Sequence, residues 1–147
     1  MRLSTFELDW RLRKGGRHTT ERRYLDFVVD GHSLVDSVQP GDIIGCLGWG
    51  AKESERQSIE QLMLKAKSRL GDGRVPIYVC PECGDLGCGA VIARIERTPM
   101  GFRWADFGFE DGLEGGVHRQ YQNVGPFEFG EEEYVGVLMK RLVTLAA

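Results

Sequence analysis

The sequence predicts an α+β fold in which an antiparallel sheet with an N-terminal β-hairpin packs against two main helices. Three observations predict it: alternating apolar and polar residues near the N-terminus, an apolar stripe at helical spacing in the middle, and a second amphipathic segment at the C-terminus. The length of 147 residues suits one domain, and the chain shows neither repeats nor a long linker. We therefore expect residues 1–147 to form a single domain.

The N-terminal hairpin is predicted from side-chain alternation. Apolar and charged residues alternate from Phe6 to Arg13, which is the pattern of a half-buried strand. Gly15-Gly16 signals a turn, and the aromatic and β-branched run from Tyr24 to Val29 is the returning strand. A short helical turn is expected over residues 34–38, and the glycine-containing apolar residues 43–49 predict a short strand or a buried irregular segment.

The two main helices are predicted over residues 52–70 and 131–146. The first carries one apolar stripe, made of Ile59, Leu62, Met63, Ala66 and Leu70, and Gly71 is its expected terminator. The second opens with three glutamates, Glu131 to Glu133, which suit the positive pole at the start of a helix.

The remaining strands are expected as an antiparallel meander over residues 75–80, 88–97 and 102–109. A polar loop over residues 110–123 and one more strand over residues 124–129 follow. The first connection of this meander contains the segment Cys80-Pro81-Glu82-Cys83-Gly84-Asp85-Leu86-Gly87-Cys88-Gly89. It holds three of the four cysteines of the chain.

This cysteine segment predicts a zinc site. Two cysteines separated by two residues can both face one ion, because Pro81 fixes φ and Gly84 permits a left-handed turn. Cys88, at the start of the returning strand, can come back beside Cys80. We therefore predict Cys80, Cys83 and Cys88 as zinc ligands.

A fourth ligand is not supplied within the segment by a second Cys-x-x-Cys pair. Cys46 and His118 are the leading candidates, and a water molecule in that position would make the site open for chemistry. Two other interpretations stay open: free thiols that serve as small apolar side chains, and thiols used as nucleophiles or redox groups.

Charge is distributed unevenly along the chain. The net charge of −3 argues against a dedicated nucleic-acid-binding protein, although the stretch Arg11–Arg23 is strongly basic and residues 105–133 are strongly acidic. The basic stretch could contact phosphates, an acidic partner or the acidic part of the chain itself. No apolar run approaches the ~18 residues of a membrane span, and no signal peptide is visible, so we expect a cytoplasmic protein.

The segment from Val75 to Ala90, together with Trp104-Ala105-Asp106-Phe107-Gly108, resembles a small uncharacterised bacterial family that is frequent in actinobacteria. The resemblance covers about the C-terminal half of the chain and implies a cytoplasmic bacterial protein. It implies no reaction, substrate or ligand set. The Cys-Pro-x-Cys-Gly turn also resembles half of a zinc-ribbon or rubredoxin site, whose other half this chain lacks.

The sequence thus favours a non-enzymatic binding or accessory protein, braced by a zinc site at its cysteines, that meets a protein partner through charged surfaces. The alternative is a cysteine-dependent enzyme that uses thiol redox or open-site metal chemistry. A weaker alternative is nucleic-acid binding through the basic hairpin Arg11–Arg23.

Overall fold

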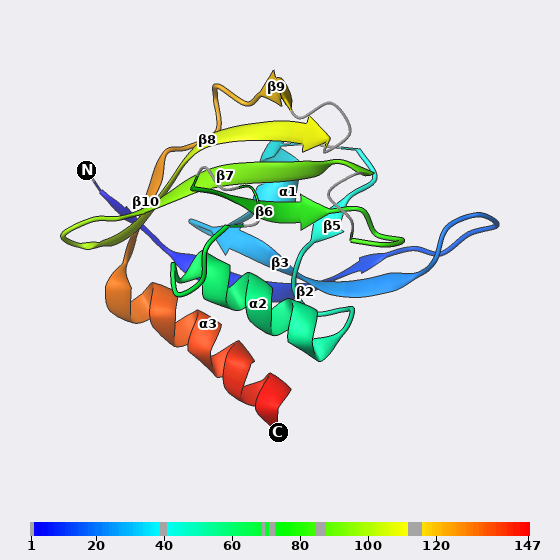
Figure 1. The fold of residues 1–147 in the computed structure, drawn as a ribbon, viewed down its shortest axis with the longest axis horizontal. Coiled ribbons are helices and arrows are strands. Elements are labelled where there is room, and N and C mark those ends of the chain that lie inside the picture. The colour runs from blue at the N-terminus through cyan, green and yellow to red at the C-terminus, as the bar shows by residue number, and fades with distance from the viewer. Residues whose placement is uncertain (1, 39–40, 69, 71–72, 85–87, 112–115) are drawn as a thin grey trace.

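The computed structural model describes the backbone of residues 2–38, 41–68, 70, 73–84, 88–111 and 116–147, and the side chains of these residues except 111 and 116–118. The described residues have the α+β fold that the sequence predicts (Figure 1). They form a small and a large sheet, which pack together with the helices around one core.

The small sheet contains the predicted hairpin. β2 (Phe6–Arg13) pairs antiparallel with β3 (Arg22–Val29), and β4 (His32–Ser33) pairs with the other side of β3. The core-facing side chains of β2 become more exposed toward the turn, since Phe6 is buried whereas Trp10 is 42 % exposed. The far half of the hairpin therefore extends beyond the body of the protein, as Figure 1 shows. The predicted helical turn follows as α1 (Leu34–Val38).

The large sheet has the strand order β1-β10-β8-β7-β6-β5, with β9 also paired to β8. β1 pairs parallel with β10, and the other pairs among the described strands are antiparallel. The strands are β1 (Leu3–Ser4), β5 (Ile44–Gly45), β6 (Arg74–Val79), β7 (Ala90–Arg97), β8 (Gly101–Asp111), β9 (Gly116–Gln120) and β10 (Phe127–Gly130).

The helices α2 (Lys52–Leu62) and α3 (Glu131–Ala146) contact each other on one side of the molecule (Figure 1). A buried aromatic cluster lies under them, in which Trp104 meets Phe6, Phe27 and Phe129 edge to face. Such edge-to-face pairs place the positive edge of one ring on the negative face of another. The cluster joins the two sheets through side chains of β2, β3, β8 and β10.

Helix α2 is shorter than predicted. It ends at Leu62 instead of continuing to residue 70, because Leu64 adopts a left-handed conformation with φ of 59°. The amide of Leu64 donates to the carbonyl of Gln61, and the amide of Lys65 donates to that of Glu60. This bonding pattern is a Schellman motif, which usually has glycine at the left-handed position. The apolar stripe thus continues past the end of the helix.

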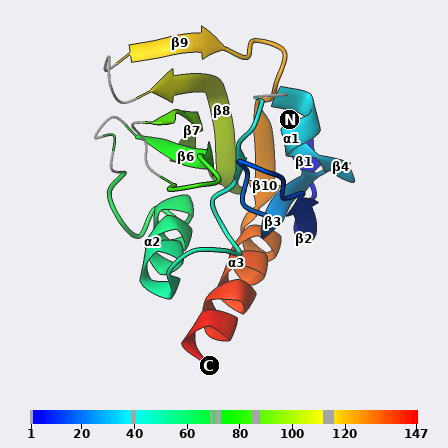
Figure 2. The same cartoon turned by 90° about the vertical axis from the view of Figure 1, so that its right-hand side faces the viewer.

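The polar residues 110–123 also differ from the prediction. Part of this stretch, residues 116–120, forms β9, which lies along the outer side of β8 (Figure 2). The last strand begins at Phe127 instead of residue 124.

The glycine-containing segment 43–49 forms only the two-residue strand β5 before it crosses to the small sheet. There the amide of Leu25 donates to the carbonyl of Leu47 over 2.9 Å. An added Cβ at Gly48 would lie 2.6 Å from the backbone nitrogen of Leu25, and one at Gly45 would lie 2.5 Å from its oxygen. Glycine at these positions allows the two sheets to approach this closely.

Candidate metal centre

Three of the four cysteines lie together in the connection between β6 and β7. We call residues 80–84 and 88–89 the cysteine loop. The sulfur atoms of Cys80, Cys83 and Cys88 all lie within 4.8 Å of one another. Cys80 is half-buried, whereas Cys83 and Cys88 are exposed. Three thiolates at this separation are close enough to bind a metal ion, which is the arrangement that the spacing of the cysteines predicts.

The turn from Cys80 to Gly84 sets this geometry. The amide of Gly84 donates to the carbonyl of Cys80 over 2.8 Å, and Gly84 is left-handed with φ of 70°. The tight turn also directs the amides of Cys83 and Glu82 at the sulfur of Cys80.

These amides favour the thiolate form of Cys80. Burial alone would raise its pKa, but the hydrogen bonds from the amides of Cys83 and Glu82 and from the neighbouring thiols outweigh that effect and lower it. The pKa of Cys88 is raised to about 12, because its thiol makes hydrogen bonds with Cys83 and Cys80. Within the cluster, Cys80 therefore favours the thiolate form, whereas Cys88 favours the thiol form.

The basic hairpin holds the cysteine loop in place. The carboxylate of Glu82 accepts hydrogen bonds from Arg13 over 2.8 Å and from the hydroxyl and the amide of Thr20 over 2.7 and 3.0 Å. Thr20 first, and then Arg13, lower the pKa of Glu82 to about 2. Arg22 donates to the carbonyl of Pro81 over 2.8 Å. The turn end of the hairpin and the cysteine loop thus form one surface.

Arg13 is at the centre of this contact. Its guanidinium group also binds Asp42 over 2.6 Å, and its side chain is 9 % exposed. Arg11, two residues earlier, binds Asp36 over 3.0 Å. The sequence left phosphates, an acidic partner and the acidic part of the chain itself open as contacts of these arginines. They pair within the chain, but with Asp36, Asp42 and Glu82, which lie outside the acidic residues 105–133. The charge pattern contained no signal for their partners, because the partners are single acids far away in the sequence.

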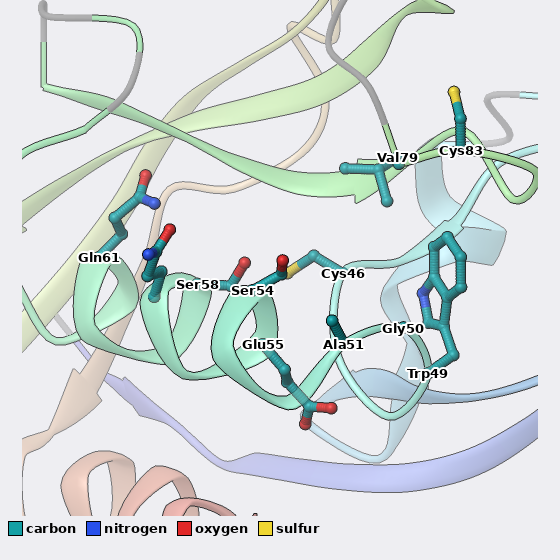
Figure 3. Close-up of a pocket in the computed structure, with 12 residues that line it drawn as sticks. Cys46, Trp49, Gly50, Ala51, Ser54, Glu55, Ser58, Gln61, Val79 and Cys83 are labelled. Atoms are coloured by element: carbon teal, nitrogen blue, oxygen red, sulfur yellow. The ribbon is translucent and has the colours of Figure 1, made fainter.

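Cys46, the first candidate for a fourth ligand, does not belong to the group of three sulfurs that the described residues form. Figure 3 shows its side chain directed toward α2, whereas the sulfur of Cys83 is directed away from that helix. His118 has its backbone in β9, and its side chain lies outside the part of the chain that the structure describes. The fourth ligand therefore stays a prediction.

The comparisons with known proteins add no family to this picture: no family model, no curated protein and no solved structure matches the chain. Among the described residues, no helix is long and apolar enough to cross a membrane.

Proposed function

We propose that the protein is a non-enzymatic binding protein whose cysteine loop holds one zinc ion through Cys80, Cys83 and Cys88. The observation that carries this proposal is the separation of the three sulfurs, which all lie within 4.8 Å of one another. Zinc prefers thiolate ligands at about 2.3 Å, so a single ion between these sulfurs can contact all of them.

The role we assign to the ion is to brace a surface for a protein partner. The cysteine loop carries Glu82, which is bound by two side chains of the hairpin, Arg13 and Thr20. An ion that fixes the loop would therefore fix the turn end of the hairpin too. This exposed, charged surface suits a protein partner, because charge complementarity guides encounter and selects the partner.

The experiment that tests the zinc site is metal analysis of untagged, reduced protein prepared without chelator. We expect about one zinc ion per chain, lost in Cys83→Ser and retained in Cys46→Ser if the fourth ligand lies elsewhere. Replacing zinc by cobalt gives thiolate-to-cobalt absorption whose intensity counts the sulfur ligands. The zinc proposal would be contradicted if the wild-type protein bound neither metal and all four of its thiols reacted with Ellman's reagent.

A specific distance favours a second candidate function, thiol redox chemistry. The sulfurs of Cys83 and Cys88 lie 3.3 Å apart, and both side chains are exposed. One hydrogen peroxide molecule would oxidise the two thiols to a disulfide and be reduced to two waters. Rapid formation of this disulfide in metal-free protein, with turnover in the presence of a reductant, would favour the enzyme over the binding protein.

A further inference from the structure

A cavity of about 530 Å³ lies between helix α2 and the cysteine loop. Its walls come from α2, from the segment between β5 and α2, and from the end of β6 with the start of the loop, as Figure 3 shows. This volume lies in the range that proteins use for small organic ligands.

Helix α2 directs uncharged polar groups at this cavity. Ser54, Ser58 and Gln61 follow one another at helical spacing along the face that looks toward β6, and Gln57 flanks them. A helix face that looks toward a sheet is normally apolar. Gln61 is nevertheless only 5 % exposed. Hydroxyl and amide groups on an inward-looking face give the cavity a wall that can both donate and accept hydrogen bonds.

The Asp, Glu, Lys, Arg and His side chains among the described lining residues leave no unpaired charge in the cavity. Glu55 is the only Asp, Glu, Lys, Arg or His among the described residues that line it. Its carboxylate accepts two hydrogen bonds from Arg141, over 2.6 and 3.2 Å, and is directed away from the cavity (Figure 3). An ionic ligand would therefore lose its hydration without gaining a counter-charge, so the lining favours an uncharged one.

Trp49 forms a rigid aromatic wall. Its indole nitrogen donates to the carbonyl of Gly45 over 2.8 Å, and the guanidinium of Arg22 lies over the ring, 4.9 Å from its centre. A Cβ added at Gly84 would lie 3.7 Å from the same indole, so the loop approaches it closely. A ring that is held in place before binding loses little entropy when a flat ligand packs against it.

We propose that this cavity binds a small uncharged ligand with a flat ring and an amide-like donor–acceptor pair, the class of aromatic carboxamides and nucleobases. The ring packs near Trp49, and the polar groups meet the hydroxyl and amide wall of α2. This proposal goes beyond the zinc site. Cys83 is the one proposed zinc ligand among the described residues that line the cavity, and its sulfur is directed away from α2, whose polar groups carry the proposal.

The test uses the full, reduced, zinc-equilibrated chain and a matched pair of probes, benzamide and benzoate, which have the same size but differ in charge. Binding is measured by the quenching of tryptophan fluorescence, with Trp49→Phe as the reference, and by protection of Cys46 from iodoacetamide, located by peptide mass mapping. We expect saturable benzamide binding on the order of 1 mM and at least roughly tenfold weaker binding of benzoate. Uracil is the second neutral probe.

Ser54→Leu is the blocking variant, because Ser54 is exposed at the cavity and leucine is a better helix former than serine. Lys52→Leu is the matched control, because Lys52 lies on the same helix and does not line the cavity. We expect the blocking variant to lose at least roughly tenfold in affinity and the control to bind like the wild type. Failure of both neutral probes to saturate, equal binding of benzoate, or unchanged binding by Ser54→Leu would each overturn the proposal and leave the zinc stoichiometry unaffected.

Discussion

Arg13 of the hairpin and Glu82 of the cysteine loop are joined by a 2.8 Å ion pair, although 69 residues separate them in the sequence. Glu82 lies between Cys80 and Cys83, so the ion pair acts on the part of the backbone that positions two sulfurs. The burial of Arg13 and its second bond, to Asp42, keep the guanidinium in place. The hairpin is therefore an outer support of the proposed metal site.

This relationship predicts that Arg13→Ala weakens zinc binding even though Arg13 contacts no sulfur. Groups that orient the ligands of a metal typically change affinity by 10–100-fold, and we expect about a tenfold loss here. The measurement is competition for zinc with a chromophoric chelator. Arg17→Ala, at the exposed turn of the hairpin, removes the same charge and is the control. Equal affinities of the two variants would contradict a supporting role for the hairpin.

The cysteine cluster was predictable from the sequence, whereas the contacts of the segments around it were not. The spacing of Cys80, Cys83 and Cys88 predicted their proximity, since a tight turn and one returning strand are local features. The attachment of Arg13 to Glu82 was not predictable, because it depends on how two distant segments pack. The same limit applies to Cys46, whose orientation is set by the crossing between the sheets.

The helices show a similar division. The limits of α3 agree with its local pattern of acids and apolar residues. The end of α2 does not agree with its local pattern, because the apolar stripe continues through Met63, where the backbone is no longer helical. Leucine at a left-handed position goes against local preference, so no propensity argument could have located this end.

Leu64→Gly is predicted to stabilise the protein. Leucine at φ of 59° carries a steric cost of about 1 kcal/mol that glycine avoids, and the side chain is 37 % exposed, so little packing is lost. Chemical denaturation should show a gain of up to about 1 kcal/mol in the free energy of unfolding. Leu64→Ala is the control, since it removes the side chain but keeps the strained Cβ. A gain from alanine as large as that from glycine would rule out relief of backbone strain as the cause.

Tyr134→Phe is predicted to destabilise the core. The tyrosine hydroxyl donates to the carbonyl of Leu62 over 2.6 Å and accepts from the indole of Trp104 over 3.0 Å, both in the buried interior. Removing it leaves two buried polar groups unpaired, which costs about 1–3 kcal/mol. Equilibrium unfolding in urea measures the difference. Tyr24→Phe is the control, because the Tyr24 hydroxyl makes no hydrogen bond with the residues that the structure describes. Equal stabilities of the two variants would refute the role of the buried hydroxyl.

Asp30→Asn is predicted to make the free energy of unfolding depend less on pH in the acidic range. Burial raises the pKa of Asp30, but the amide of Thr5, the hydroxyl of Ser4 and the charge of Arg2 outweigh it and lower the pKa below its ordinary value. A carboxyl group whose pKa is lower in the folded than in the unfolded chain contributes stability above the unfolded pKa of ~3.9, and this contribution is lost as the pH falls through the folded pKa. Wild type should therefore exceed the variant in stability at neutral pH, and the gap should close as the pH falls from about 5 toward 3.

Asparagine tolerates the left-handed backbone of this position, where φ is 52°, so strain does not confound the comparison. Unfolding free energies of both proteins across this range measure the gap, and a gap that stays constant with pH would show that ionisation of Asp30 contributes nothing to folding.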